Sequence, residues 1–483
     1  MGVPFIHCFR THKEHYFYDF NTNAIVRVDK GVYGCLEEWE KNKKCPNMDF
    51  SIRGKIEELK EIGFLSDSHW KKIEHPATKM LEHYLNSSLE TITLQVTQQC
   101  NLKCNYCPYS GSYYNREHND RHMSFDIAKR AVDFYIRHSF DLPAIQIGFY
   151  GGEPLLEFSL IKEIVAYCKK ACAGKEVRYL MTTNATLLTE DKIEFLMEND
   201  FILTISLDGP RQYHDRNRHK IDDSGTFDTV MKNISKIYEM YPHKRGNVQF
   251  NCVLDPTSDI TCVNDFFLNE EMLKEYQVRF SSVSREGIKD EDKFLPDEQY
   301  LEQYKYELFK MFYAKTGKVK GIDVSKVVEE YYGQIKNIYA KRTLSCLKEE
   351  FSHPSGPCIP GVHKLFVDVK GDFYPCEKVC ECSCDMVIGN VEHGLDLKEV
   401  DRHLNIGRLT EEQCKDCWSA KNCYICSAHL DQGQGLSSEL KQRKCANVRS
   451  HIEDDFKNYC LLYELGSFKE DAIYFTGEGK ESS

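Results

Sequence analysis

The 483-residue sequence has no long uninterrupted run of apolar side chains. None approaches the 18 residues that cross a membrane, so no spanning helix and no membrane partner are expected. The opening residues M-G-V-P-F-I-H-C also lack the charged and apolar regions of a signal peptide, which favours a cytoplasmic protein. An excess of positive charge is absent as well: 63 lysines and arginines are outnumbered by 75 aspartates and glutamates, which gives a net charge of −12. Because a nucleic-acid binder normally carries a basic face, this balance argues against a nucleic-acid partner.

Cysteine, in contrast, is abundant, with 22 residues concentrated toward the C-terminal third. A reducing cytosol disfavours persistent disulfides, and a chain of this length does not need them to fold. Cysteine in such a protein usually serves metal or redox chemistry. The sequence therefore predicts more than one metal site.

Three of the cysteines, Cys100, Cys104 and Cys107, lie in one loop directly after the strand-like segment 91–97. Three thiolates can hold three corners of a cubic iron–sulfur cluster and leave one iron without a protein ligand. An open coordination position marks a metal site that does chemistry, whereas structural sites are closed. A zinc site or three incidental cysteines is the alternative.

The spacing C-x3-C-x2-C of this loop resembles the signature of the radical SAM superfamily. In that family the open iron chelates S-adenosylmethionine and gives it one electron, which releases a 5′-deoxyadenosyl radical. The radical then removes a hydrogen atom from the substrate. The resemblance implies a SAM-binding [4Fe-4S] cluster, S-adenosylmethionine, and an electron donor such as flavodoxin or ferredoxin.

Short β-branched runs alternate with amphipathic helical stretches from about residue 91 to 283. Six such units with apolar strands predict an α/β protein with a parallel sheet covered by helices. Six rather than eight is typical of the partial (β/α)6 TIM-like barrel of the radical SAM family. Site residues are then expected at the carboxyl ends of the strands. The expected strands are 91–97, 144–150, 177–184, 202–208, 248–255 and 277–283.

A glycine-rich turn follows the second expected strand, where glycines allow the backbone to approach a ligand closely. Its residues Gly151, Gly152, Glu153 and Pro154 match the G-G-E-P motif, which in the family binds the amino group of S-adenosylmethionine. Tyr106, between the second and third cysteines of the loop, resembles the aromatic residue that lies against the adenine. An ordinary turn is the alternative.

Three further polar residues follow the later strands. By resemblance, Asn184 and Ser206 contact the ribose or methionine portion of the cosubstrate. The stretch H-D-R-N-R at 214–218, followed by G-T-F-D at 225–228, resembles a motif of radical SAM enzymes that modify peptides. Arg218 occupies its arginine position, and a guanidinium suits the methionine carboxylate. Cap, turn or surface roles are the alternatives.

Residues 1 to about 90 have a different pattern. Segments 15–20 and 24–29 bracket Asn21-Thr22-Asn23 as a hairpin, and helices are expected near 31–42 and 51–63, the second ending at Gly63. The pattern resembles the winged-helix-like peptide-recognition element of enzymes that modify ribosomally made peptides. Such an element binds a leader peptide as an added strand. A generic small α+β appendage is the alternative.

The C-terminal cysteines resemble the SPASM domain, which holds auxiliary iron–sulfur clusters. The central run departs from the family spacing, because only Tyr424 and Ile425 separate its last two cysteines. A zinc ribbon would place 15–20 residues between its two C-x2-C pairs, whereas here there are five. The matching residues are Cys358, Cys376, Cys414, Cys417, Cys423, Cys426 and Cys445.

Family precedent divides these ligands between two auxiliary [4Fe-4S] clusters. One cluster would take Cys414, Cys417, Cys423 and Cys445, and the other Cys358, Cys376 and Cys426, with Cys346 as the natural fourth ligand. If Cys346 does not bind, an open iron is free for a substrate thiolate. Cys380, Cys382 and Cys384 are extra cysteines that substitute for a ligand, bind adventitious metal, or do neither.

The combined resemblance is to sactipeptide and ranthipeptide maturases. It implies an enzyme that installs thioether crosslinks, from cysteine sulfur to carbon, in a ribosomally synthesised cysteine-rich precursor peptide with a leader. The expected domains are 1–90 (peptide recognition), 91–320 (barrel), 321–460 (bridging helices and SPASM domain) and 461–483 (tail). An anaerobic sulfatase-maturase-like enzyme that forms formylglycine and a non-catalytic zinc-binding protein are the alternatives. No catalytic proton acceptor is identifiable.

Overall fold

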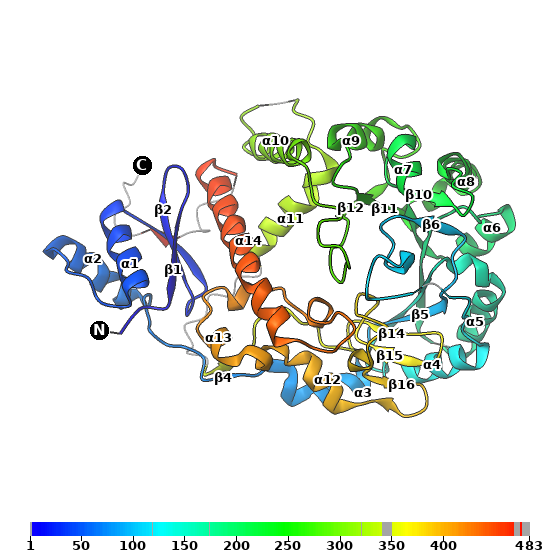
Figure 1. The fold of residues 1–483 in the computed structure, drawn as a ribbon, viewed down its shortest axis with the longest axis horizontal. Helices are drawn as coiled ribbons and strands as arrows, with labels where there is room; N and C mark the ends of the chain where they lie inside the picture. The colour runs from blue at the N-terminus through cyan, green and yellow to red at the C-terminus, as the bar shows by residue number, and fades with distance from the viewer. Residues whose placement is uncertain are drawn as a thin grey trace.

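The computed structural model describes residues 2–117, 119–172, 174–319, 321–340 and 350–467, together with the strand at 474–475. Cys346 lies outside these ranges. Figure 1 shows a curved sheet with helices on its outer side, an N-terminal sheet with two helices, and a C-terminal region between them.

All six expected strands are present and lie side by side in chain order, each parallel to its neighbour. Their ends lie within two residues of the expected ones, and β5 has the expected bounds. They are β5 (Thr91–Thr97), β7 (Ala144–Gly151), β8 (Glu176–Thr183), β9 (Ile202–Ser206), β11 (Val248–Leu254) and β12 (Gln277–Ser282).

Amphipathic helices cover the outer face of this sheet (Figure 1). In α4 (Phe125–Arg137), for example, the Ser124 side chain caps the first turn, and Ala131, Val132 and Tyr135 are buried against the sheet. Burying one large apolar side chain contributes about 1.5–3 kcal/mol, so this stripe fixes which helix face meets the strands. The other outer helices are α5 (Phe158–Ala171), α6 (Glu190–Glu198), α7 (Arg211–Asn217), α8 (Phe227–Met240) and α9 (Ile260–Asn269).

The sheet continues past β5 into the C-terminal region, which was not predicted. Strand β14 (Leu365–Val367) pairs in parallel with β5 and supplies partners for its free edge. Three antiparallel strands follow, β15 (Asp372–Tyr374), β16 (Gly389–Asn390) and β17 (Gly394–Leu395). One sheet therefore spans both regions that the sequence divided at residue 320.

The N-terminal region contains the expected hairpin and both helices. Strand β2 (His15–Asp19) pairs with β3 (Ala24–Val28), and the Asp19 carboxylate accepts the backbone N–H of Thr22 in the turn (2.9 Å). Gly63 ends α2 (Phe50–Ile62) in the left-handed region, at φ 107°. The strands β1 (Ile6–Arg10) and β18 (Tyr474–Phe475), which border this hairpin, and the helix α1 (Lys30–Asn42) complete the region.

The two faces of this N-terminal sheet pack against different partners. One face packs on α1 and α2, which contribute the buried Trp39 and Leu59 to its core. The other face, with Phe9 and Tyr18, shares a core with Phe456 of α14 (Ser438–Glu464). The N-terminal region is therefore part of a joint core rather than a detached appendage. Its assignment as a winged-helix-like recognition element stays a prediction.

The remaining elements join the two halves. The helices α10 (Glu298–Lys315) and α11 (Lys326–Ala340) occupy the expected bridging segment, and α11 packs on α14 and β12. Strand β4 (Lys72–Ile73) pairs with β13 (Phe351–Ser352). The helices α3 (Leu81–Ser87), α12 (Leu397–Leu404) and α13 (Glu411–Lys415) complete the list. Because α14 runs to Glu464, the expected boundary at residue 460 falls inside a helix.

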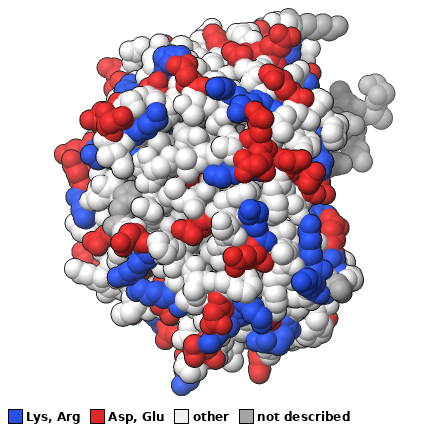
Figure 2. Space-filling model, turned by 90° about the vertical axis from the view of Figure 1, so that its right-hand side faces the viewer, with Lys and Arg blue, Asp and Glu red and all other residues white. Residues whose placement is uncertain are grey.

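The surface carries both signs of charge. On the face drawn in Figure 2, lysine and arginine side chains are mixed with aspartate and glutamate, so this face is not a continuous basic surface. Within the described ranges, no helix has the length and apolar character needed to cross a membrane.

Candidate active site

The three-cysteine loop leaves the carboxyl end of β5, as expected for a site on a parallel sheet. Burial, with smaller contributions from Glu153 and from the neighbouring thiols of Cys104 and Cys107, raises the pKa of Cys100 to about 12. The short strand β6 (Leu102–Cys104) within the loop pairs with β10 (Arg218–Lys220). In this register Cys104 lies opposite Arg218. Burial raises the pKa of the Cys104 thiol to about 12, and the positive charge of Arg218 limits that rise.

The two glycines of the G-G-E-P turn are required by the backbone of the cysteine loop. A Cβ atom on Gly151 would lie 1.9 Å from the carbonyl oxygen of Thr97, and one on Gly152 would lie 2.1 Å from that of Gln99. The amides of Gly152 and Glu153 donate to these same two carbonyls, at 3.0 and 2.9 Å. The glycines therefore hold the end of β7 against the cysteine loop. The ligand contact that the sequence predicted for them stays a prediction.

Glu153 is fully buried, and its carboxylate is already engaged by the protein. It accepts the backbone N–H of Leu155 (3.1 Å), the hydroxyl of Thr183 (2.7 Å) and the backbone N–H of Asn184 (2.7 Å). Burial raises its pKa, which these hydrogen bonds oppose. Glu153 thus ties the ends of β7 and β8 together, while the neighbouring Pro154 begins a short 3-10 helix.

Asn184 lies beside the cysteine loop at the end of β8. Its amide nitrogen is 2.9 Å from the Asn101 side-chain oxygen and 4.0 Å from the Cys100 sulfur. Its side-chain oxygen accepts two hydrogen bonds from Thr186. Ser206 lies at the end of β9, opposite Asn251 of β11, and is nearly buried. Both residues therefore lie at the end of the sheet from which the cysteine loop departs, as predicted.

Tyr106 and Arg218 meet on a third residue, Asp208, which the sequence reading did not include among the site residues. The Arg218 Nε donates to the Asp208 carboxylate (2.8 Å), and the Tyr106 hydroxyl donates to the same oxygen. The guanidinium also lies 5.4 Å from the Tyr106 ring centre. All three side chains are buried. The Nε of Arg218 is thus used in an ion pair with Asp208. The predicted contact with a cosubstrate carboxylate would need the other N–H groups of Arg218.

The H-D-R-N-R and G-T-F-D stretches hold Arg218 in place. His214 Nδ1 accepts the backbone N–H of Asp208, and its Nε2 lies 3.0 Å from the Thr226 hydroxyl. That hydroxyl donates to the Arg218 carbonyl (2.8 Å). Asp215 accepts the backbone N–H groups of Thr226 and Phe227. The motif is therefore a supporting frame for one buried arginine.

Four C-terminal cysteines form one group around α13 and α14. The pKa of Cys423 is raised to about 11 by burial, with contributions from Cys417 and Cys414. The pKa of Cys445 is raised by burial and by the same two thiols. These electrostatic effects place all four thiols near one another. They are the four that the sequence assigned to one auxiliary cluster.

A second group contains Cys358, Cys376 and Cys426. Burial raises the pKa of Cys376 to about 11, and Cys426 contributes to the increase. Burial and Cys358 in turn raise the pKa of Cys426. The unusual two-residue spacing before Cys426 therefore still brings its thiol to the other two. The fourth expected member, Cys346, lies outside the described residues.

The extra cysteines belong to a loop that reaches the barrel. Glu381, between Cys380 and Cys382, forms a buried ion pair with Arg116 (2.6 Å) and accepts from the Gln95 amide of β5 (2.8 Å). A hydrogen bond from Cys380 lowers the pKa of Cys382 to about 7. No pattern in the sequence indicated the Arg116–Glu381 pair, because it joins residues 265 positions apart that lack a motif of their own.

The cysteine groups suit iron–sulfur clusters by the chemistry of their donors. Thiolates are soft ligands that select iron–sulfur clusters, zinc or copper(I). Within the described ranges, no group of three or more His, Cys, Asp or Glu side chains is arranged to hold a single metal ion. A cubic cluster places each thiolate on a different iron, so it needs a wider set of thiols than one ion does. The three described groups each contain three or four cysteine thiols, which is the donor set that such a cluster takes.

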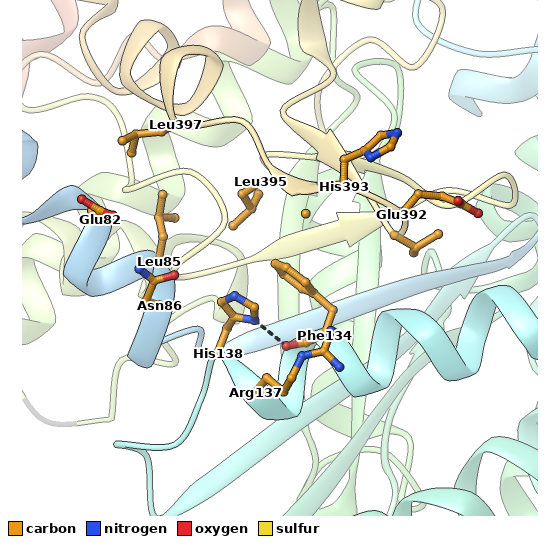
Figure 3. A pocket seen from close by; sticks show the side chains of 12 residues that line it. Glu82, Leu85, Asn86, Phe134, Arg137, His138, Glu392, His393, Leu395 and Leu397 are labelled. Atoms are coloured by element: carbon orange, nitrogen blue, oxygen red, sulfur yellow. Dashed lines mark hydrogen bonds between the residues drawn. The ribbon is translucent and has the colours of Figure 1, made fainter.

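A pocket of about 380 Å³ lies elsewhere, between α3, α4 and the β16–β17 hairpin (Figure 3). Arg137, His138 and His393 line it, and His138 Nδ1 is 2.7 Å from the Phe134 carbonyl oxygen. His138 precedes β7, so the pocket lies toward the amino ends of the strands. The cysteine loop is at the opposite ends, and the pocket is therefore separate from the candidate active site.

Comparison with known proteins agrees with this geometry. Residues 94–266 match the family model described as the radical SAM superfamily. The serine-type anaerobic sulfatase-maturating enzyme of Bacteroides thetaiotaomicron is 24% identical over 341 residues, which cover 66% of this chain and 77% of that protein. The radical SAM cyclopropyl synthase TigE of Paramaledivibacter caminithermalis is 24% identical over 254 residues, covering 48% and 52%.

Among solved structures, native anSMEcpe with bound AdoMet and Kp18Cys peptide has a similar fold. Its TM-score is 0.53 at 19% identity, and the match covers 76% of this chain and 99% of that one. Residues 94–266 therefore resemble a radical SAM domain, and the chain is similar to anaerobic sulfatase-maturating enzymes and to a cyclopropyl synthase.

Proposed function

We propose that this radical SAM protein is an oxidoreductase that installs thioether crosslinks in a ribosomally made, cysteine-rich precursor peptide. The observation that carries the proposal is the presence of three convergent cysteine groups, one in the barrel and two in the C-terminal region. The first group suits a SAM-binding cluster with an open iron, and the other two suit auxiliary clusters. The bound clusters and S-adenosylmethionine would supply electron transfer and the 5′-deoxyadenosyl radical.

The chain's own residues position this chemistry. Cys100, Cys104 and Cys107 would hold the first cluster, and Gly151 and Gly152 keep the end of β7 against that loop. Arg218, held by Asp208, places a buried positive charge beside Cys104 and favours its thiolate form. Tyr106 packs against the same guanidinium. The three cysteines are partly buried, so charges near their thiols interact more strongly than in bulk water.

The C-terminal groups would hold the auxiliary clusters. Cys414, Cys417, Cys423 and Cys445 supply four thiolates, enough to close one cluster. Cys358, Cys376 and Cys426 supply three, and Cys346 is the proposed fourth. Without Cys346, this group keeps one position for a cysteine thiolate of the substrate, which is the sulfur that a thioether needs.

The position of the N-terminal sheet is an argument for a peptide substrate. Its Tyr18 and His7 contact the loop that bears the auxiliary cysteines: His7 stacks on Trp418 (ring centres 3.8 Å apart), and Tyr18 accepts from Asn422 (3.4 Å). A leader bound at this sheet would therefore hold a precursor peptide close to the auxiliary groups. Edge addition to a sheet is a common mode of peptide capture.

A second function is supported by the comparisons, because relatives over most of the barrel are named anaerobic sulfatase-maturating enzymes. By this alternative, the chain oxidises a Cys or Ser side chain of a protein to formylglycine. Both functions begin with the same radical and use the same barrel. They differ in the product, which distinguishes them chemically.

The test is coexpression of the chain with a candidate cysteine-rich precursor peptide, chosen from the open reading frames that neighbour its gene, followed by mass spectrometry. A thioether predicts the loss of two hydrogens for each link, protection of one thiol from iodoacetamide, and no reaction with a hydrazide. Formylglycine predicts a hydrazide-reactive aldehyde and leaves the other thiols alkylatable. Cys100→Ala is the inactive control. An unmodified peptide with and without its leader would refute the thioether proposal.

Metal analysis separates both enzymes from a zinc protein. Three cubic clusters predict about twelve irons per chain after anaerobic purification. A colourless protein with zinc and no iron would instead establish the non-catalytic alternative.

A further inference from the structure

A buried lysine lies beside one of the two auxiliary cysteine groups. Lys441 of α14 is 2% exposed, and its Nζ donates to the Ile406 carbonyl (3.0 Å) and to the Cys414 sulfur (3.5 Å). In the described part of the chain its partners are thus a neutral carbonyl and a thiol sulfur, not a carboxylate. Burying an ammonium is costly unless a negative charge compensates it. A thiolate at Cys414 is the charge in place to do so.

Two hydroxyl groups add to this arrangement. The Thr410 hydroxyl lies 3.3 Å from the Cys414 sulfur, and the Ser419 hydroxyl lies 3.2 Å from the Cys417 sulfur. Both residues are buried. Once the cysteines are ligating thiolates, the sulfurs accept and the hydroxyls donate. Three buried donors therefore converge on two of the four thiols of this group.

The second cysteine group lacks an equivalent charge at hydrogen-bond distance among the described residues. His429 Nδ1 lies 3.5 Å from the Cys426 sulfur, but this nitrogen accepts the Cys426 backbone N–H (3.0 Å) and so carries no proton to donate. Lys364 is ion-paired with Glu377 (2.8 Å), and Lys378 is exposed to solvent. The positive charges near this group are therefore either neutralised or screened.

We propose that Lys441, with Thr410 and Ser419, makes the cluster held by Cys414, Cys417, Cys423 and Cys445 easier to reduce than the cluster at Cys358, Cys376 and Cys426. Reduction adds one negative charge to a cluster. A buried ammonium and hydrogen bonds to the ligating sulfurs stabilise that charge, and they are known levers on cluster potential. The inference depends on the ligation assigned under the proposed function. Lys441 acts here as a positioning residue through Cys414.

The test is a reductive titration of the anaerobically reconstituted full-length protein, followed by electron paramagnetic resonance. Cys376→Ser, which removes a ligand of the second cluster, identifies the signal of that cluster, and Cys100→Ala identifies that of the SAM-binding cluster, so the remaining signal belongs to the Cys414 cluster. Lys441→Met is expected to lower the equilibrium constant for reduction of the Cys414 cluster at least tenfold, ~59 mV for a one-electron couple. Lys441→Gln, which keeps an N–H donor without the charge, should give a smaller decrease, and Thr410→Val a smaller one still.

The matched control is Lys457→Met, which removes a lysine from the same helix that is ion-paired with Glu453 and partly exposed. Its potentials should equal those of the unaltered protein. Unchanged potentials in Lys441→Met, with full iron content, would overturn the inference while leaving the proposed function intact. If Lys441→Met does not fold, unchanged potentials in both Lys441→Gln and Thr410→Val would overturn it. Absence of iron from the unaltered protein would refute the proposed function itself.

Discussion

Replacing Gly152 with alanine is expected to displace the cysteine loop. The added Cβ would lie 2.1 Å from the Gln99 carbonyl oxygen and 3.0 Å from the Cys100 backbone nitrogen. Ordinary contacts begin at 3.4 Å, so the backbone beside Cys100 must move by about 1 Å. Both obstructing atoms are main chain and cannot rotate away. Overpacking of this kind costs about 1–3 kcal/mol.

The assay is the iron content after anaerobic reconstitution, together with the midpoint of thermal unfolding. Because Gly152 does not have a positive φ, the substitution tests close packing alone. We expect the variant to lose iron at the SAM-binding cluster and to unfold several degrees lower. Gly54→Ala is the matched control, since a Cβ there meets nothing within 4 Å and Gly54 lies inside α2. Alanine there should stabilise the protein by about 0.5–1 kcal/mol. Full iron content and an unchanged midpoint in Gly152→Ala would refute the packing argument.

Three further predictions follow from charges and ligands. Burial opposes protonation of His7, but Glu40 and Glu453 outweigh burial and raise the pKa of His7. The stability that the protonated His7 contributes is therefore complete below about pH 6.5 and is lost as the pH rises through the raised pKa. Thermal unfolding from pH 6 to 9 should show this loss, and the His7→Gln variant should not show it. Arg218→Met should lower the free energy of unfolding by about 3–5 kcal/mol, because it leaves the Asp208 carboxylate buried without its partner. In urea titrations, adding Asp208→Asn should restore part of this loss, whereas a double variant whose loss equals the sum of the two single losses would contradict the pairing. Cys376→Ser should remove about four of the twelve expected irons, whereas Cys262→Ser should remove none.

The barrel was predictable because each of its strands carries a local pattern. Near-continuous apolar runs such as 91–97 are buried on both faces, and that burial fixes them as parallel strands. The hairpin at 15–28 was also predictable, since its turn residues are local. Strands β14 and β18, with three and two residues, were missed. Their positions depend on a free edge offered by a distant segment, and no local pattern records that edge.

The candidate site was partly predictable for the same reason. Cysteine spacing indicated the loop of Cys100, Cys104 and Cys107, because these three residues lie in one short segment. The division of the C-terminal cysteines into two groups came from the resemblance to the SPASM domain, since Cys358 and Cys426 are far apart in the sequence. The partners of Arg218 were not indicated by spacing, since a buried arginine needs a counter-charge, and Asp208, which follows β9, reaches Arg218 only through the fold of the segment between β9 and β10. The Arg116–Glu381 pair and Lys441 were missed likewise. Polar residues that support a site through burial have no sequence signature of their own.

The joint core also changes how a leader-binding role can be tested. Residues 1–90 were predicted to form a separate domain, yet Phe9 and Tyr18 are buried against Phe456 of α14. The same helix carries Cys445 and Lys441. Deleting the module would expose this face to water at about 25 cal/mol for each Å² and would disturb the auxiliary group directly. Loss of activity after such a deletion would therefore not identify leader binding. Offering the intact chain a precursor peptide with and without its leader removes the leader contact and leaves the core unchanged. Only this comparison separates leader recognition from protein stability.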